Sequence, residues 1–295
     1  MKIGFAGLGV MGGPMAGHLV RAGHDVSGFN RSPDKARAWA DATGGRFAPT
    51  VEAAASGADL FVLCVGNDDD VRAVVPAALS SLGAGAVIVD HTTTSAKVAR
   101  EMAELASGQG AFFIDAPVSG GQSGAEAGQL SVMAGGDAAA LARVEPVLMS
   151  YAKAVRHMGA PGNGQLTKMV NQIAIAGVVQ GLAEAVHFAQ TAGLDTDAVH
   201  DAVSKGAAQS WQMDNRWKTA AAGQFDFGFA VDWMRKDLGL VLDEARANGA
   251  HLALTALVDQ FYSEVQSMGG SRWDTSSLTA RLQRPATTSG RSGAG

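Results

Sequence analysis

The chain begins with a short apolar segment that runs directly into a glycine-rich turn. Lys2 to Ala6 is long enough for a buried strand, and Gly7-Leu8-Gly9-Val10-Met11-Gly12 follows it. Beyond this turn, Met15, Leu19 and Val20 recur at helical spacing. A glycine motif of this spacing between a strand and a helix indicates a dinucleotide site, whereas the motif alone would also fit an ordinary turn.

Each glycine of the motif has its own expected role. Gly7 permits a tight turn, Gly9 lacks the side chain that would block a pyrophosphate, and Gly12 lets the helix pack closely on the strand. The N–H groups at the start of that helix, together with the helix dipole, favour phosphate charge. We therefore expect residues 7–12 to contact the pyrophosphate of a bound dinucleotide.

The second predicted strand, Asp25 to Phe29, ends in Asn30, Arg31 and Ser32. An acidic residue at this point would bind the adenosine ribose and repel a 2′-phosphate. This chain has an amide and an arginine there, and the planar guanidinium of arginine suits a phosphate. Ser32 adds a hydroxyl, or caps the helix that begins at Pro33. The pattern favours NADP(H), with NAD(H) possible. A solvated arginine and a capping serine are the alternative interpretation.

The next two predicted strands also end in small or polar residues. Leu60 to Val65 leads into Gly66 and Asn67, and Ala86 to Asp90 leads into a run of hydroxyl side chains around Thr93. In open α/β sheets, ligands bind beyond the carboxyl ends of the strands. We expect further cofactor contacts from Val65, Gly66, Asn67 and Thr93. The hydroxyl groups fit equally well as caps of the helix predicted over residues 96–107.

A third such segment follows the strand predicted over Ala111 to Ile114. It reads Asp115-Ala116-Pro117-Val118-Ser119-Gly120-Gly121, a turn of small residues with one hydroxyl side chain and several available N–H groups. Such a turn can hold a carboxylate at close range.

From Gly162 onward, the sequence predicts only helices. Leu166 to Ala192 is apolar almost all round, which predicts a helix that is buried on most sides. Lys168, Asn171 and Gln172 lie on one face of it. A lysine in an apolar helix is costly unless it is paired or functional, and burial would lower its pKa toward neutrality. It is therefore a candidate proton donor and acceptor. The alternative is a lysine whose stem lies along the domain boundary with its charge in water.

A second lysine, Lys236, is followed by Asp237 within another apolar helical stretch. We expect Lys236 to lie over the cofactor, with Phe229 about two turns earlier on the same side of the helix. The alternative interpretation is a surface ion pair.

Composition excludes several classes of function. The net charge is −5 without a basic run, which argues against nucleic acid as a partner. The single cysteine, Cys64, excludes an internal disulfide, and the seven scattered histidines form no close pair that would bind a metal. No apolar run approaches the ~20 residues that span a bilayer. A strand at the very start leaves no room for a signal peptide, so we expect a cytoplasmic protein.

Four blocks, in this order, resemble the β-hydroxyacid dehydrogenase family, which includes 3-hydroxyisobutyrate dehydrogenase and tartronate semialdehyde reductase. The blocks are residues 7–16, residues 115–121, Gly162-x-Gly164-x-x-x-Lys168-x-x-Asn171-Gln172, and Lys236-Asp237-Leu238. The resemblance covers residues 1 to about 280. It implies an α/β Rossmann-type dinucleotide-binding domain over residues 1–161. A long interdomain helix would join this domain to an all-α C-terminal domain over residues 162–284, in a homodimer or homotetramer. We expect residues 285–295 to be a disordered tail.

The resemblance also implies a role for each candidate residue. Lys168 would be the general acid and base, Ser119, Gly120 and Gly121 would hold a substrate carboxylate, and Asn171 and Gln172 would orient the substrate. Val65, Thr93, Phe229 and Lys236 would lie near the cofactor. The implied reaction is hydride transfer between NADP(H) and a small 3-hydroxy acid or its semialdehyde. The alternatives are an imine or sulfo-aldehyde reductase of the same family and a non-catalytic NADPH-binding sensor or scaffold.

Overall fold

The computed structural model describes residues 1–283, and the chain divides into two compact units. The first unit is Met1–Asn171, and the second starts at Gln172. The domain boundary expected between residues 161 and 162 therefore stays a prediction. The tail expected over residues 285–295 lies outside the described residues.

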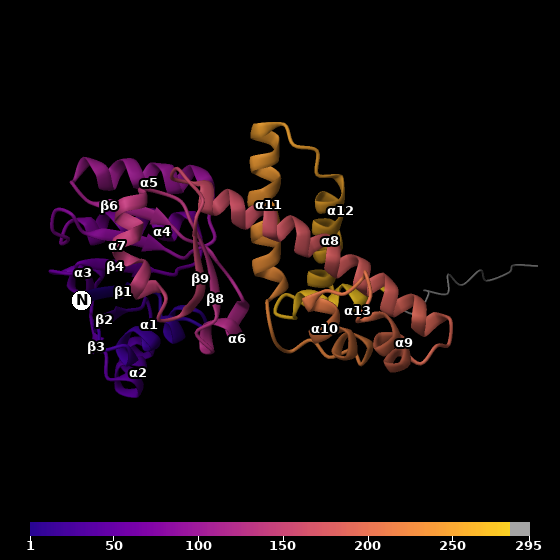
Figure 1. Ribbon diagram of the computed structural model, residues 1–295. Coiled ribbons are helices and arrows are strands. Elements are labelled where there is room, and N and C mark those ends of the chain that lie inside the picture. The colour runs from indigo at the N-terminus through magenta and orange to yellow at the C-terminus, as the bar shows by residue number, and fades with distance from the viewer. Residues whose placement is uncertain (284–295) are drawn as a thin grey trace, which may run out of the picture. The chain divides into compact units, whose positions relative to one another are not determined.

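A six-stranded parallel sheet forms the centre of the first unit (Figure 1). Its strand order is β3-β2-β1-β4-β5-β6, so the chain first builds outward from β1 on one side and then returns to build on the other. Such a reversal beside the first strand is where open α/β sheets bind ligands, beyond the carboxyl ends of the strands. The strands are β1 (Lys2–Ala6), β2 (Asp25–Phe29), β3 (Arg46–Phe47), β4 (Leu60–Leu63), β5 (Val87–Asp90) and β6 (Phe112–Asp115).

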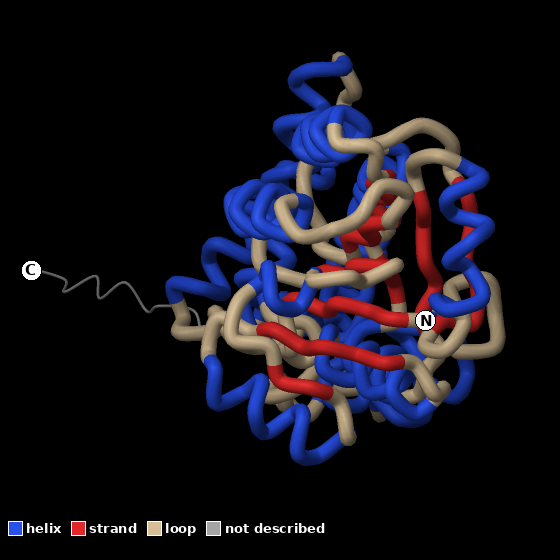
Figure 2. The backbone as a smooth tube through the Cα atoms, turned by 90° about the vertical axis from the view of Figure 1, so that its left-hand side faces the viewer, coloured by secondary structure: helices blue, strands red, loops and turns tan. Residues whose placement is uncertain are grey.

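Both faces of this sheet are buried, because alternate residues of a strand point to opposite faces and both sets are apolar here. Leu60 and Val62 belong to one buried cluster, and Phe61 and Leu63 belong to the other. Figure 2 shows the helices, in blue, on either side of the red strands. The first cluster packs against α1 (Gly12–Arg21), α2 (Pro33–Thr43) and α7 (Ala138–Leu148), and the second against α3 (Val51–Ala55), α4 (Asp68–Leu79) and α5 (Ala96–Gly108).

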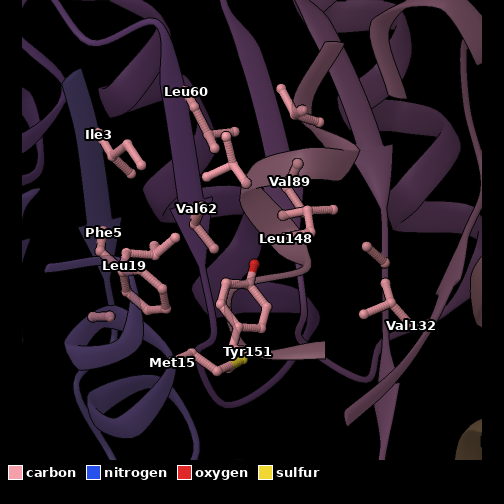
Figure 3. Close-up of a cluster of buried hydrophobic side chains, with 14 of the residues drawn as sticks. Ile3, Phe5, Met15, Leu19, Leu60, Val62, Val89, Val132, Leu148 and Tyr151 are labelled. Atoms are coloured by element: carbon pink, nitrogen blue, oxygen red, sulfur yellow. The ribbon is translucent and has the colours of Figure 1, made fainter. Parts of the chain in front are cut away.

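The first cluster also encloses a tyrosine hydroxyl. Figure 3 shows Tyr151 among Met15, Val62 and Leu148, with its oxygen inside the cluster. Tyr151 is fully buried. A buried hydroxyl requires a hydrogen-bond partner, and it has one in His91, described below.

A second, three-stranded sheet with the order β7-β8-β9 completes the first unit. β7 pairs antiparallel with β8, and β8 pairs parallel with β9. A bridge between Asp115 and Gly135 connects the end of β6 to the segment that follows β8. The elements are β7 (Val118–Ser119), α6 (Gly121–Glu126), β8 (Leu130–Ala134) and β9 (Ala152–His157). β3, β7 and α6 were not predicted from the sequence, because segments this short carry no detectable periodicity.

The described part of the second unit is helical, as predicted. Its central core combines Ala176 and Val179 of α8 with Met234 and Leu238 of α11 and Val258 of α12. The bounds are α8 (Asn163–Thr191, which begins in the first unit), α9 (Thr196–Val203), α10 (Trp211–Ala221), α11 (Val231–Asn248), α12 (Ala253–Ser267), η1 (Thr275–Ser277) and α13 (Leu278–Leu282).

The long helix α8 is less buried than its composition predicted. Along one face Val170 is 65%, Val178 40% and Phe188 70% exposed, and the expectation of burial on most sides is therefore wrong. Residues on its other side join the core of the second unit. Within residues 1–283, α8 alone is long and apolar enough to cross a membrane by length and composition, a test that core helices of soluble proteins also pass. The apolar residues of α8 therefore lie partly in a core and partly along an exposed stripe. Periodicity alone could not distinguish these two sets.

Candidate active site

The glycine turn combines two close backbone approaches with one open position. Gly7 has φ +93°, and a Cβ on it would lie 2.1 Å from the carbonyl oxygen of Cys64. A Cβ on Gly12 would lie 1.8 Å from the carbonyl oxygen of Gly7. A Cβ on Gly9 would have no heavy atom within 4 Å, so the space beside it is open. A side chain there would fill the space through which a pyrophosphate would approach the turn.

The start of α1 also fits an anion. No side chain caps this helix, and its first turn contains no acidic residue. The positive end of the helix dipole is therefore not neutralised by the protein itself. Asn30 supports the turn from the next strand end: its Oδ1 accepts a hydrogen bond from the Leu8 N–H at 3.0 Å, and its Nδ2 donates to the Ser32 carbonyl at 3.2 Å. These contacts make Asn30 a support of the turn, a role that sequence reasoning did not assign to it.

Arg31 and Ser32 follow at the end of β2. The Arg31 side chain is 90% exposed, and its Nη1 lies 3.5 Å from Oδ1 of Asp70. Ser32 occupies the N-cap position of α2 but makes no side-chain capping bond, so its hydroxyl is not used for that purpose. Asp70 also accepts a hydrogen bond from the Gly66 N–H at 3.0 Å, which links this corner to the end of β4.

Several polar residues after β4 and β5 have structural roles in the fold. The Val65 N–H donates to Oγ1 of Thr92 at 3.0 Å, which joins the two strand ends. Asn67 caps α4 by accepting a bond from the Asp70 N–H, and Ser95 caps α5. Thr93 is half-buried, between two buried threonines. The capping interpretation therefore holds for Ser95, while a cofactor contact of Thr93 stays a prediction.

The turn expected to hold a carboxylate has an unusual backbone. Ser119 is half-buried in β7, and Gly120 and Gly121 follow with φ of +133° and +62°. Two successive residues in this region favour glycine, because a Cβ would be strained there. Both glycines are exposed, so their N–H groups lie near the surface of the first unit.

Lys168 lies in the second turn of α8 and is only 9% exposed. Asn171, one turn further, is half-buried and closes the first unit. The start of α8 is attached to the sheet by Asp115, the last residue of β6. Its carboxylate accepts hydrogen bonds from the N–H groups of Gly162 at 2.8 Å and Gln165 at 2.9 Å. Burial raises the pKa of Asp115 to about 6, although these N–H bonds favour its charged form.

Sequence reasoning missed two buried residues beside the segment that follows β6, His91 and Tyr151. His91 is fully buried, with Nδ1 2.6 Å from the Ala116 carbonyl oxygen and Nε2 2.7 Å from the Tyr151 hydroxyl. A carbonyl only accepts, so Nδ1 carries the proton and Nε2 accepts from Tyr151. Burial lowers the pKa of His91 to about 4, and it raises that of Tyr151 well above 10. No local pattern links these positions, which lie 60 residues apart.

The remaining candidates lie in the second unit. Gln172 is 2% exposed, and its Nε2 donates to Oδ2 of Asp237 at 2.7 Å. Nζ of Lys236 lies 3.3 Å from Oδ1 of the same carboxylate, which is 3% exposed. Because Asp237 is buried, the interpretation of Lys236 and Asp237 as a surface ion pair is wrong. Contacts of Gln172 with substrate and of Lys236 with cofactor stay predictions.

Contrary to the prediction from the sequence, Phe229 does not lie on the helix of Lys236. α11 begins at Val231, so Phe229 precedes the helix and cannot lie two turns before Lys236 on its face. Its N–H donates instead to Oδ2 of Asp274 at 3.0 Å, and the residue is 36% exposed. The apolar periodicity continued across Phe229 although the hydrogen-bonded helix did not.

Within residues 1–283 no group of three or more histidine, cysteine, aspartate or glutamate side chains is placed to hold a metal. A parallel sheet of this order, with an uncapped helix after an open glycine turn, defines the Rossmann-type proteins that bind nicotinamide dinucleotides.

Comparisons with known proteins agree with this class. Residues 2–159 match the NAD binding domain of 6-phosphogluconate dehydrogenase, and residues 162–282 match the NAD-binding family of NADP-dependent 3-hydroxyisobutyrate dehydrogenase. An uncharacterized oxidoreductase of Shewanella frigidimarina is 60% identical over 96% of this chain and 98% of its own length. A probable 3-hydroxyisobutyrate dehydrogenase-like protein of Arabidopsis thaliana is 40% identical over 96% of this chain and 85% of its own length.

A solved structure is similar over nearly the whole chain. Mycobacterium tuberculosis 3-hydroxyisobutyrate dehydrogenase, with L-serine, has a TM-score of 0.88 and 33% identity over 96% of this chain and 99% of its own. The chain belongs to the β-hydroxyacid dehydrogenase family. It is an NAD(P)-dependent oxidoreductase of the 3-hydroxyisobutyrate dehydrogenase type that acts on CH–OH groups of small molecules, as the sequence predicted.

Proposed function

We propose that this protein transfers hydride between NADP(H) and a small 3-hydroxy acid or the matching semialdehyde, with Lys168 as general acid and base. The main support is the position of Lys168: it is 9% exposed and follows a helix start that is hydrogen-bonded to the carboxyl end of β6. Ligands of open α/β sheets bind at that end of the strands. This position supports a role for Lys168 at the carboxyl edge of the sheet, where a substrate would lie.

The protein's part in the reaction is placement and proton transfer. Bound NADP(H) supplies or accepts the hydride. Lys168 gives a proton to the carbonyl oxygen during reduction and takes it from the hydroxyl during oxidation, and such proton transfer contributes about 10²–10⁴-fold to the rate. The Ser119 hydroxyl and the N–H groups of Gly120 and Gly121 bind the substrate carboxylate, and Asn171 orients the reacting oxygen.

The preference for NADP(H) rests on Arg31. Its guanidinium is exposed at the end of β2, and no acidic residue follows this strand directly. A 2′-phosphate would compete with Asp70 for it. An exposed ion pair contributes only about 0–1 kcal/mol, so a phosphate that accepts a bidentate contact displaces it readily.

The same interpretation extends to assembly and location. The exposed stripe of α8 is apolar at Val170, Val178 and Phe188, and a contiguous apolar face of this kind marks an interaction surface. A second copy of the chain, related by two-fold symmetry, would cover the equivalent residues in a homodimer or a homotetramer. The cytoplasmic location stays a prediction of the sequence.

Lys168→Ala tests the proposed catalytic role, with Lys153→Ala in β9 as the matched control because Lys153 is exposed. NADPH and NADH oxidation are measured with methylmalonate semialdehyde, tartronate semialdehyde, succinic semialdehyde and glyoxylate. Lys168→Ala should bind NADPH normally while kcat falls by about 10²–10⁴-fold, and Lys153→Ala should be unaffected. Unchanged turnover in Lys168→Ala would refute the catalytic role. If the unmodified protein binds NADPH tightly but turns over none of the four aldehydes, the non-catalytic alternative is favoured.

A further inference from the structure

The first turn of α8 is capped by a residue from a distant strand. The first four N–H groups of a helix lack partners within it and need them from elsewhere. Here both oxygens of the Asp115 carboxylate are used: Oδ1 accepts from Gly162 and Oδ2 from Gln165, at 2.8 and 2.9 Å. Asp115 is fully buried. Its negative charge also complements the positive end of the helix.

The side chain of Gln165 attaches the same turn to a second strand end. Its Nε2 donates to the carbonyl oxygen of Thr92 at 2.7 Å, and its Oε1 accepts from the N–H of Thr94 at 3.0 Å. Gln165 is fully buried, so both hydrogen bonds are shielded from water. The two ends of one amide group therefore hold the segment that follows β5, which includes Thr93.

Glycines leave no clearance between this turn and the strands. A Cβ on Gly164 would lie 2.4 Å from the Met133 carbonyl oxygen and 2.5 Å from that of Asp115. A Cβ on Gly135 would lie 2.8 Å from the Gly164 nitrogen. The helix start is thus in direct backbone contact with the strand ends, and a sliding or rotation of α8 would break several hydrogen bonds together.

We propose that Asp115 and Gln165 are positioning residues that set the place of Lys168 relative to the segments that would bind cofactor and substrate. Lys168 follows Gln165 by three residues, about 4.5 Å along the helix axis. Gln165 fixes this turn against Thr92 and Thr94, and Asp115 fixes it against the start of the segment that leads to Ser119. The inference rests on the proposed function of Lys168.

Gln165→Met tests it, because methionine keeps the length and volume of the side chain and removes both hydrogen bonds. Gln180→Met is the matched control: Gln180 is also a buried glutamine of α8, 4% exposed, but its Nε2 donates to Glu184 on the same helix. A misplacement of about 1 Å lowers a catalysed rate by about 10²-fold. We expect kcat of Gln165→Met to fall by about that factor, with the number of NADPH sites per chain unchanged, and Gln180→Met to keep the kcat of the unmodified protein.

An isotope effect separates positioning from a loss of folded enzyme. With NADPH deuterated at the transferred position, a misplaced Lys168 makes the chemical step slower, so the isotope effect on kcat should rise in Gln165→Met. A purely structural role would lower kcat in proportion to the number of NADPH sites and leave the isotope effect unchanged, and that result would overturn the inference. A kcat within about twofold of the natural value would also overturn it.

Lys168→Ala, measured in parallel, distinguishes the two failures. If Lys168→Ala turns over normally, the proposed function fails. If Lys168→Ala is inactive while Gln165→Met is fully active, only the positioning inference fails. Asp115→Asn should behave as Gln165→Met does. The asparagine oxygen can accept a hydrogen bond from one of the two backbone N–H groups, but its NH₂ group is a donor and cannot accept from the second.

Discussion

The buried pair of His91 and Tyr151 predicts a specific dependence of stability on pH. His91 donates through Nδ1 to Ala116 and accepts through Nε2 from Tyr151, so the neutral ring satisfies both contacts. A protonated ring would carry an unbalanced charge into a fully buried site and oppose the Tyr151 hydroxyl with a second donor. Burial accordingly lowers the pKa of His91 from 6.5 to about 4.

The magnitude follows from linkage between protonation and folding. The unfolded chain binds a proton at His91 below pH 6.5, whereas the folded protein does so only near pH 4, so stability is present above pH 6.5 and is lost as the pH falls. At 1.36 kcal/mol for each pH unit, the free energy of unfolding falls by about 3 kcal/mol in total. About 2 kcal/mol of this loss has occurred by pH 5. Asp115 acts in the opposite direction: its pKa is raised from 3.8 to about 6, so it adds stability as the pH falls through that range.

A comparison with His91→Gln isolates the contribution of His91, because Asp115 is present in both proteins. Free energies of unfolding are measured by urea titration at pH 7.5 and pH 5, followed by circular dichroism. His91→Gln is expected to be less stable at pH 7.5, since it fits the two contacts less well. Between the two pH values the natural protein should lose about 2 kcal/mol more than the variant. An equal change in both proteins would refute the assignment of His91 as the buried neutral group.

Three further predictions concern the cofactor site and assembly. Gly9→Ala should fold normally because its Cβ meets nothing within 4 Å, yet lose NADPH affinity in a fluorescence titration, whereas Gly12→Ala should lose stability itself because its Cβ would lie 1.8 Å from a backbone oxygen. Equal melting temperatures for these two variants would contradict this reasoning. Arg31→Ala should raise KM for NADPH by about 10-fold with little change for NADH, the loss expected for a charged hydrogen bond of about 1.5 kcal/mol, and a parallel change for both cofactors would count against a phosphate contact. Phe188→Glu should lower the mass found by light scattering if the exposed stripe of α8 lies between copies, and an unchanged oligomer would place the interface elsewhere.

The class and order of most elements could be predicted from the amino-acid sequence, because their signals are local. Short apolar runs in the strands, helical spacing after Gly12, and glycines where the backbone must turn are properties of a few neighbouring residues. The predicted strand over residues 25–29 has the same bounds in the structure. The family followed from four motifs whose order is likewise readable along the chain.

The contacts between polar groups far apart in the sequence could not be predicted in this way, because they depend on the folded arrangement of the strands. Asp115 caps a helix start 47 to 50 residues away, Gln165 reaches Thr92 over 73 residues, and His91 reaches Tyr151 over 60 residues. Each of these partners is set by the order of strands in the sheet, which the local pattern does not contain. The exposed face of α8 could not be predicted from the sequence either. An apolar helix shows the same periodicity whether a given face packs within its own chain or remains on the surface.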